Sequence, residues 1–235
     1  MFREINDSFE NAVRFFRKDI IPTDSKLDGI LEMFDNVYKM YSHELRNSIL
    51  ELIGNKLPRT KHPLYYNYLI CNGTKLTQFL QQFRADSIVN EEIRTCHVLE
   101  FCGHCLYAGK GINQRMLSHL VNGKKIKHEL ILTELNAKYS EIIKVWERGE
   151  GIAIVRLYAE INHYEALSRE NALIKALGLI NLTNKINGTC YGVMKHGWND
   201  TEITNFGTMM LYYTLKMLVM EPPTVLMEDD IMLTY

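Results

Sequence analysis

The sequence predicts an α+β fold, in which a small central sheet is flanked by helices and preceded by an N-terminal helical extension. Three observations lead to this prediction. Apolar residues recur at helical spacing through residues 1–57. Short aliphatic and aromatic runs, bounded by turn residues, stand near residues 64–70, 103–108 and 152–158, and longer amphipathic stretches separate them.

Composition limits the class of protein. The chain has 235 residues, of which 46% are hydrophobic and 23% are charged. This balance is typical of a globular protein with one sizeable core and a smaller appended region, and it excludes a disordered or fibrous chain.

The N-terminal region is predicted to be helical over residues 1–57. Apolar residues at helical spacing include Phe9, Val13 and Phe16, and they resume from Leu27. Residues 22–25 predict a break and a cap between two helices. Residues 56–63 contain two prolines among basic and polar residues, so they are predicted to form a linker.

The middle of the chain is predicted to alternate strands and helices. Strands are expected at 64–70 and 103–108, and residues 109–111 are expected to form a turn after the second strand. Asn113 is a candidate cap for a helix that continues to about residue 121. A longer helix is expected from about residue 130 to 146, closed by the glycines at 149 and 151.

The C-terminal part is predicted to contain a third strand over 152–158 and a helix over about 168–179. After the turn at Asn187-Gly188 a short strand is expected over 190–193. A last helix over about 201–220 ends before two prolines and leaves an acidic tail. The predicted units are therefore an N-terminal helical region (1–57), a central domain (58–200) and a C-terminal helix with its tail (201–235).

Several features of the sequence favour an intracellular location, nuclear or cytoplasmic. No apolar run reaches the roughly 18 residues of a membrane-spanning helix, and the charged N-terminus lacks a signal peptide's apolar stretch. The cysteines number five, and an odd number fits free thiols in a reducing compartment better than a disulfide framework.

Charge is unevenly distributed along the chain, although the formal net charge is only -1. No acidic residue lies between Glu100 and Glu129, a window that provides a local positive field for a polyanionic substrate. A solvated basic surface is the alternative interpretation. The basic residues of this window are Lys110, Arg115, Lys124, Lys125 and Lys127.

Two motifs suggest other chemistry. Cys102-Gly103-His104-Cys105 matches a redox motif, and with Cys96 and His97 it offers enough ligands for zinc. An apolar strand follows this motif instead of the long helix that redox chemistry needs, so buried strand cysteines are the favoured interpretation. The segment from Gly103 to Gly111 resembles a phosphate loop, but its spacing differs and it lacks the serine or threonine that holds magnesium.

A different set of side chains predicts phosphodiester hydrolysis that depends on a metal. Tyr107 ends a predicted strand, Lys110 and Arg115 lie near the start of a helix, and Glu170 and Asn184 follow downstream. These side chains provide a base, cations for a phosphate, a metal ligand and a polar anchor, which together suit a nuclease.

Seven segments carry a resemblance to the GIY-YIG endonuclease superfamily, and within it to metazoan nucleases with ankyrin repeats and a LEM domain. They are Tyr-Ala-Gly-Lys-Gly at 107–111, Ser-His-Leu at 118–120, Val-Trp-Glu-Arg-Gly-Glu-Gly at 145–151, Ser-Arg-Glu-Asn-Ala at 168–172, Ala-Leu-Gly at 176–178, Leu-Thr-Asn at 182–184 and Tyr-Gly-Val at 191–193. The resemblance covers residues 64–198 and implies a small, mainly antiparallel sheet flanked by helices.

The chain also departs from the superfamily pattern. Ala108 replaces the usual aliphatic residue of the second signature, and Tyr66-Asn67-Tyr68 serves as a divergent first signature. About 38 residues separate Tyr68 from Tyr107, which implies an insertion from about residue 71 to 103. No ankyrin repeats are recognised, and residues 1–57 do not resemble a LEM domain.

The resemblance implies a role for each site residue. Glu170 would bind Mg²⁺ or Mn²⁺, and Tyr68 and Tyr107 would lie side by side, one of them activating the attacking water. Arg115 and Lys110 would contact the scissile phosphate and offset its charge.

Three further roles are expected. His119 would lie on the same helical face as Arg115 and relay a proton, bind phosphate or serve a structural role. Asn184 would fix the turn after the Glu170 helix. Lys124, Lys125 and Lys127 would contact the nucleic-acid backbone.

The expected function is a metal-dependent endonuclease that cuts branched or single-strand-containing DNA, with a role in DNA repair. An inactive nucleic-acid-binding module and an RNA-directed nuclease are the alternatives. Retention of the metal ligand, the arginine and the tyrosine favours an active enzyme.

Overall fold

The computed structural model describes residues 27–53, 64–86, 95–130 and 136–233. The predictions made for residues 1–26 and for the linker at 56–63 lie outside these ranges, as do the side chains of residues 27–34 and of Cys96. The helix predicted to continue after residue 26 is confirmed as α2 (Leu27–Leu52).

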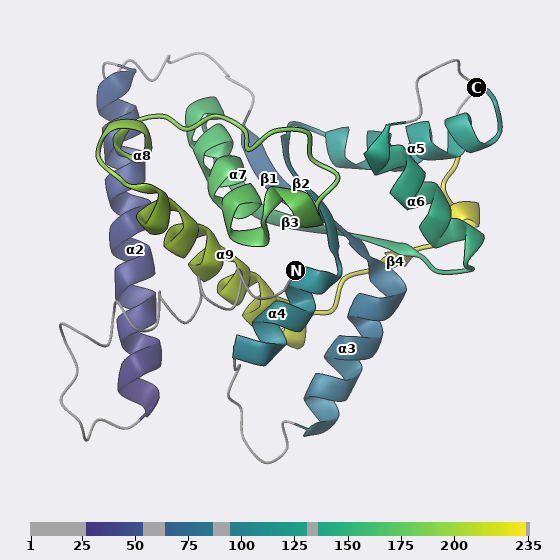
Figure 1. Ribbon diagram of the computed structural model, residues 1–235, viewed down its shortest axis with the longest axis horizontal. Helices are drawn as coiled ribbons and strands as arrows, with labels where there is room; N and C mark the ends of the chain where they lie inside the picture. Colours follow the sequence, from purple (N-terminus) through teal and green to yellow (C-terminus); the bar gives the residue numbers. More distant parts are fainter. Residues whose placement is uncertain (1–26, 54–63, 87–94, 131–135, 234–235) are drawn as a thin grey trace.

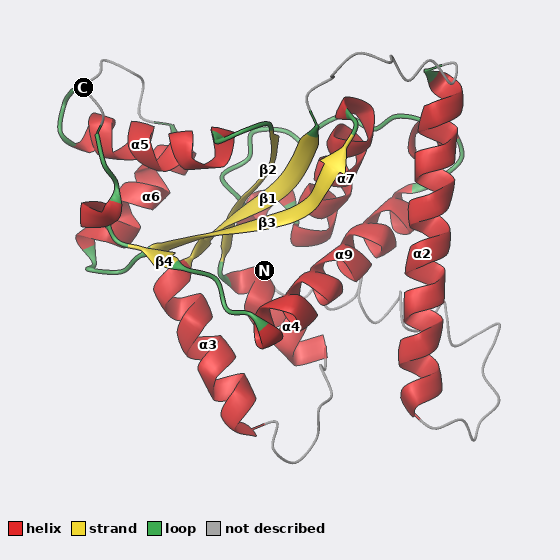
Figure 2. Cartoon of the chain, turned by 180° about the vertical axis from the view of Figure 1, so that it is seen from behind, coloured by secondary structure: helices red, strands yellow, loops and turns green. Residues whose placement is uncertain are grey.

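The architecture is α+β, as predicted, with one antiparallel sheet in the order β2-β1-β3-β4 (Figures 1 and 2). Helices cover both faces of the sheet. After α2 the elements are β1 (Tyr65–Asn72), α3 (Gly73–Asp86), α4 (Thr95–Gly103), β2 (Cys105–Gly111), α5 (Arg115–Lys127), α6 (Ala137–Glu147), β3 (Ile152–Ile161), α7 (His163–Leu177), α8 (Val193–His196), α9 (Asp200–Met220) and β4 (Val225–Leu226), with 3-10 turns at Leu179–Asn181 and Glu228–Asp230. No helix among these described segments is long and apolar enough to cross a membrane.

Strand β1 lies at the centre of the sheet, and all but its first residue are buried. Its side chains alternate between two apolar clusters, because successive residues of a strand point to opposite faces. Tyr66, Tyr68 and Ile70 pack in the cluster with α5 and α6, whereas Leu69 and Cys71 pack in the cluster with α2, α7 and α9. The tyrosines of β1 are therefore presented to the face covered by α5 and α6.

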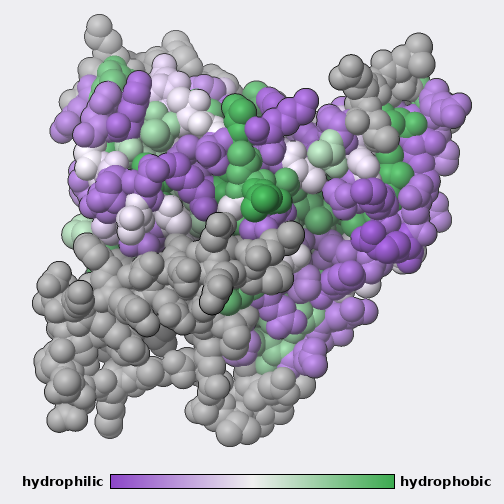
Figure 3. Space-filling model, viewed as in Figure 1, coloured by the Kyte–Doolittle hydropathy of each residue, from purple (hydrophilic) through white to green (hydrophobic). Residues whose placement is uncertain are grey.

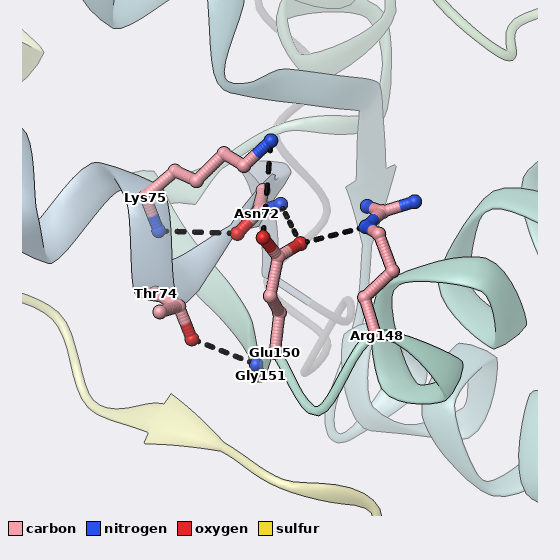
Figure 4. Close-up of polar contacts among 6 residues, drawn as sticks. All are labelled: Asn72, Thr74, Lys75, Arg148, Glu150 and Gly151. Carbon is pink, nitrogen blue, oxygen red and sulfur yellow. Dashed lines mark hydrogen bonds and ion pairs between the residues drawn. The ribbon is translucent and has the colours of Figure 1, made fainter.

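The predicted insertion between the first two strands is confirmed as the helical pair α3 and α4. Figure 4 shows how α3 is anchored at its start. The Asn72 side chain accepts a hydrogen bond from the Lys75 backbone (3.1 Å) and donates one to Glu150 (2.8 Å), which also binds Arg148 (3.0 Å). These contacts, chiefly the one with Asn72, lower the pKa of Glu150. The insertion is thus fixed to the turn between α6 and β3.

Several predicted elements differ from the structure. Residues 109–111 belong to β2 and do not form a turn, because each pairs with a residue of β1. Asn113 has φ 49°, and Gln114 is the N-cap residue that precedes α5, so Asn113 is not the cap. Helix α5 extends to Lys127, and Asn136 caps α6 by accepting from the Tyr139 backbone.

Two more differences lie near the C-terminus. Helix α7 begins at His163, before the predicted start near 168, because Asn162 caps it there. The strand predicted over 190–193 is absent from this described segment, where α8 begins at residue 193. The fourth strand comes instead from the predicted acidic tail, where β4 pairs with β3. Long-range pairing decided this choice, and local sequence could not reveal it.

Candidate active site

The two predicted tyrosines lie side by side on one face of the sheet. Tyr68 pairs with Gly109, and Tyr107 stands two pairs farther along, opposite Ile70, with the Tyr68 and Tyr107 ring centroids 6.1 Å apart. A Cβ atom on Gly109 would lie 2.7 Å from atoms of both rings, so glycine provides the space they occupy. Tyr66 shares this face, but its hydroxyl donates to the Asn113 carbonyl (2.8 Å). Tyr68 is therefore the residue of the first signature that stands beside Tyr107.

His119 of α5 joins the tyrosine pair through its two ring nitrogens. Nε2 lies 2.6 Å from the Tyr68 hydroxyl oxygen, and Nδ1 lies 3.0 Å from Nζ of Lys138. Burial, together with the charges of Lys138 and Arg115, lowers the pKa of His119 to about 3. Since an ammonium can only donate, Nδ1 accepts, and the neutral ring carries its proton on Nε2. That proton is donated to the Tyr68 oxygen.

Lys138, in the first turn of α6, was not predicted as a site residue. Its ammonium lies 4.5 Å from the centroid of the Tyr107 ring as well as beside His119. Burial, followed by the charge of Arg115, lowers its pKa to about 8. The one local indication of Lys138 in the sequence was Asn136, because its side chain caps α6 and so fixes the first turn, in which Lys138 lies. Nothing in the sequence placed that turn beside Tyr107.

Glu170 of α7 faces a pocket of about 390 Å³ at the β2 edge of the sheet. Burial raises the pKa of its carboxyl to about 6, opposed by the charges of Lys110 and Arg115 and by a hydrogen bond from the Lys110 backbone. Tyr107, Lys138 and Asn184 line the same pocket. The structure therefore brings the predicted carboxylate, cations and Tyr107 to one place.

A divalent metal fits this pocket. Among the described residues no group of three or more His, Cys, Asp or Glu side chains gathers around one point, so Glu170 offers a single carboxylate. Mg²⁺ and Mn²⁺ prefer oxygen ligands, and Mg²⁺ keeps several waters and uses substrate phosphates. The partly desolvated carboxylate of Glu170, beside an open pocket, suits that mode of binding.

Asn184 is an anchor for the edge strand. Its side chain donates to the Ala108 carbonyl (2.8 Å) and accepts from the Ala108 amide (3.1 Å). The neighbouring Thr183 donates from both its backbone and its hydroxyl to the Leu106 carbonyl (2.8 and 2.9 Å). The segment after α7 thus occupies hydrogen-bonding groups on the outer edge of β2, next to Tyr107.

The segment after α7 also forms an apolar rim of the pocket. Ile180 and Ile186 are 80% and 70% exposed, and Ile186 lines the pocket. Figure 3 shows apolar surface in the middle of this face, over the segment that follows α7, between hydrophilic residues. The pocket therefore combines charged groups with an apolar border.

The predicted backbone contacts Lys124 and Lys127 have different partners in the structure. Lys124 donates to the carbonyls of Glu228 (2.9 Å) and Ile231 (3.0 Å), and Lys127 pairs with the Glu228 carboxylate (2.5 Å). The C-terminal segment thus contacts both cations, and their assignment as nucleic-acid contacts stays a prediction. The sequence concealed the pairing because Glu228 lies about one hundred residues away. The role of Lys125 as a peripheral contact likewise stays a prediction.

The cysteine motif bridges a helix and a strand. Cys102 lies in α4 and not in a strand as predicted, Cys105 begins β2, and both thiols are buried. Burial raises the pKa of Cys102 to about 12, which keeps the thiol protonated and unreactive. The sulfurs of Cys71 and Cys105 lie 3.7 Å apart. Apolar packing is thus the role that the described cysteines fulfil.

Replacing Cys102 and Cys105 with alanine is expected to leave metal-dependent cleavage within about tenfold, because the loss is confined to packing of about 1 to 2 kcal/mol. Cleavage rates and thermal melting of the double variant, beside Cys190→Ala as a control, check this expectation. Stoichiometric zinc in the purified protein, with unfolding by a chelator, would contradict it.

Comparisons with known proteins agree with this site. The LEM-3-like GIY-YIG domain family matches residues 65–233. A mouse protein named ankyrin repeat and LEM domain-containing protein 1 is 30% identical over 166 residues, which are 71% of this chain and 30% of the mouse protein. Its homologue in Caenorhabditis elegans is 26% identical over 68% of this chain and 23% of that protein.

The human protein of the same name is 29% identical over 53% of this chain and 20% of its own length. The chain thus spans less than a third of each of these relatives. No solved structure matches. Because the family match covers well over half of the residues and includes every site residue described above, the chain belongs to the LEM-3-like GIY-YIG family of nuclease domains.

Proposed function

We propose that this chain is a metal-dependent endonuclease that hydrolyses DNA phosphodiester bonds, with a preference for branched or single-strand-containing DNA. One observation carries the proposal: Tyr107, Glu170 and Lys138 line one pocket, and the charges of Lys110 and Arg115 act on the same carboxylate. A base, a metal ligand and cations around one cavity are what phosphodiester hydrolysis needs. Cleavage of branched DNA would serve DNA repair.

Glu170 would hold Mg²⁺ or Mn²⁺. When bound, such an ion neutralises charge on the phosphate oxygens as the attacking group approaches. Arg115, exposed at the start of α5, would contact the same phosphate, because a planar guanidinium matches two phosphate oxygens. Lys110, on β2, adds a second positive charge that acts on Glu170.

A directed series of hydrogen bonds supports Tyr107 as the base. Lys138 donates to His119, His119 donates to Tyr68, and Tyr68 forms a hydrogen bond that lowers the pKa of Tyr107. Burial has a larger effect and raises the pKa of Tyr107. The positive charge of Arg115, like the hydrogen bond from Tyr68, lowers it. Tyr107 faces the pocket, so its ionised form would receive the proton of the attacking water, with Tyr68, His119 and Lys138 as positioning residues.

The test is a cleavage assay on branched, duplex and single-stranded DNA and on the matching RNAs, with and without Mg²⁺. The proposal expects Mg²⁺-dependent cleavage that is fastest on branched or partly single-stranded DNA. Faster cleavage of RNA would favour the RNA-directed alternative, and tight binding without cleavage would favour the inactive module.

Lys138→Met is expected to slow single-turnover cleavage about ten- to hundredfold while KM changes little. The substitution keeps the length of the side chain but removes the charge that fixes the His119 tautomer, and changes of this kind behind a catalytic group typically have such an effect. Lys144→Met is the matched control, because Lys144 lies exposed on the same helix and pairs with Glu141. Equal cleavage rates for both variants would show that Lys138 has no role in the reaction.

We also propose an intracellular location, nuclear or cytoplasmic. The cysteines at 71, 102, 105 and 190 carry free thiols, as expected in a reducing compartment.

A further inference from the structure

A row of aromatic rings leads away from the active site. Lys110 lies 5.0 Å from the centroid of the Tyr65 ring, which contacts His163 (4.9 Å between centroids). His163 contacts Tyr164 (5.5 Å), and Tyr164 contacts Tyr191 (4.9 Å). We call Tyr65, His163, Tyr164 and Tyr191 the aromatic track. It starts at the lysine whose charge acts on Glu170.

The track lies where β1 begins, β2 ends and α7 begins. Figures 1 and 2 place these three points at the same end of the sheet's strands, beside the end of α2. It is a surface feature. Tyr164 is 37% exposed, and the other three rings are half-buried. A side chain needed only for core packing would be fully covered, as Phe101 and Phe206 are (0% exposed).

The far end of the track forms one wall of a second pocket, of about 580 Å³. Tyr164 and Tyr191 line it together with the cationic or titratable residues Lys195 and His196, both exposed. The aromatic wall is held in position, because the Tyr191 backbone donates to the Ser168 hydroxyl (2.9 Å) on α7. The track thus joins a catalytic lysine at one end to a basic, partly aromatic pocket at the other.

We infer that the aromatic track binds an unpaired DNA strand of the substrate as it leaves the active site, an inference that rests on the proposed nuclease function. Single-stranded nucleic acid is bound by exposed rings that stack with bases and by cations that follow the phosphates. A duplex hides its bases, so the rings would gain little from it. The track therefore supplies a physical basis for preferring DNA with a single-stranded segment.

The test uses the full chain and a fluorescent oligothymidine of ten nucleotides, in EDTA so that binding is measured without cleavage. Tyr164→Leu and Tyr191→Leu keep apolar bulk but remove the ring. Each is expected to weaken binding about tenfold, within the range for loss of one base-stacking ring. Tyr164→Phe is expected to bind like the parent, because it keeps the ring. Met217→Leu, at an exposed position on α9, is the matched control.

Cleavage supplies the second measurement. Both leucine variants are expected to slow cleavage of a flapped duplex about tenfold but leave cleavage of a blunt duplex within about twofold. Unchanged oligothymidine binding in correctly folded variants overturns the inference, and so does an equal loss on oligothymidine and duplex. If the parent chain cleaves nothing, the proposed function fails, while the binding measurement in EDTA still decides whether the track holds a single strand.

Discussion

Glu170→Gln is expected to abolish cleavage while the fold and most of the nucleic-acid affinity remain. The amide has nearly the same shape as the carboxylate but lacks the charge that holds the metal. Loss of the metal removes several kcal/mol of transition-state stabilisation, roughly 10³-fold or more in rate. Affinity depends mainly on phosphate contacts with cations, so it should persist or increase.

Single-turnover kinetics at saturating Mg²⁺, beside binding in EDTA, measure the two effects separately. Glu165→Gln is not a suitable control, since Glu165 forms a buried ion pair with Arg169. Glu141→Gln is suitable, because the Glu141 side chain is 35% exposed and its ion pair with Lys144 lies at the surface of α6. Turnover of Glu170→Gln near that of Glu141→Gln would exclude Glu170 as the metal ligand.

The pKa of Glu170 adds a pH dependence to this prediction. Burial raises it to about 6, so the carboxyl is protonated below that pH and ionised above it. Only the ionised form binds Mg²⁺. The Mg²⁺ concentration needed for half-maximal cleavage should therefore rise as the pH falls below about 6, by about tenfold for each pH unit. A requirement for Mg²⁺ that stays constant from pH 5 to 8 would contradict this expectation.

Arg115→Ala is expected to reduce turnover about 10²- to 10³-fold, the effect of losing one contact that forms with the developing charge. Lys125→Ala is the comparison, because Lys125 lies on the same helix but two turns or more from the pocket-side start of α5. It should weaken binding and reduce the salt dependence with little change in the chemical step. Single-turnover rates at saturating protein, measured at two salt concentrations, separate chemistry from affinity.

A larger chemical loss for Lys125→Ala than for Arg115→Ala would reverse the interpretation of the basic window. The structure gives a reason to expect the stated order. Burial raises the pKa of Tyr107 and of Glu170, and the positive charge of Arg115 opposes both increases, so Arg115 acts on the proposed base and on the metal ligand.

The sequence by itself determined the family, the α+β class and the main elements near the site. Tyr107, Glu170 and Asn184 could be recognised because each stands in a short motif, and Arg115 because it follows the first of these motifs near the start of a predicted helix. Helices α2 and α9 and strands β1 and β3 could be predicted because their apolar patterns are local and long.

Only the tertiary structure decided which side chains meet. Lys138 stands in no motif, yet the packing of α6 against α5 brings it to His119 and Tyr107. Lys124 and Lys127 stood in the basic window, yet the C-terminal segment folds back and binds them. The physical reason is the same in both cases: a hydrogen bond or ion pair depends on distance in space, whereas the periodicity of a sequence records only which face of an element is apolar.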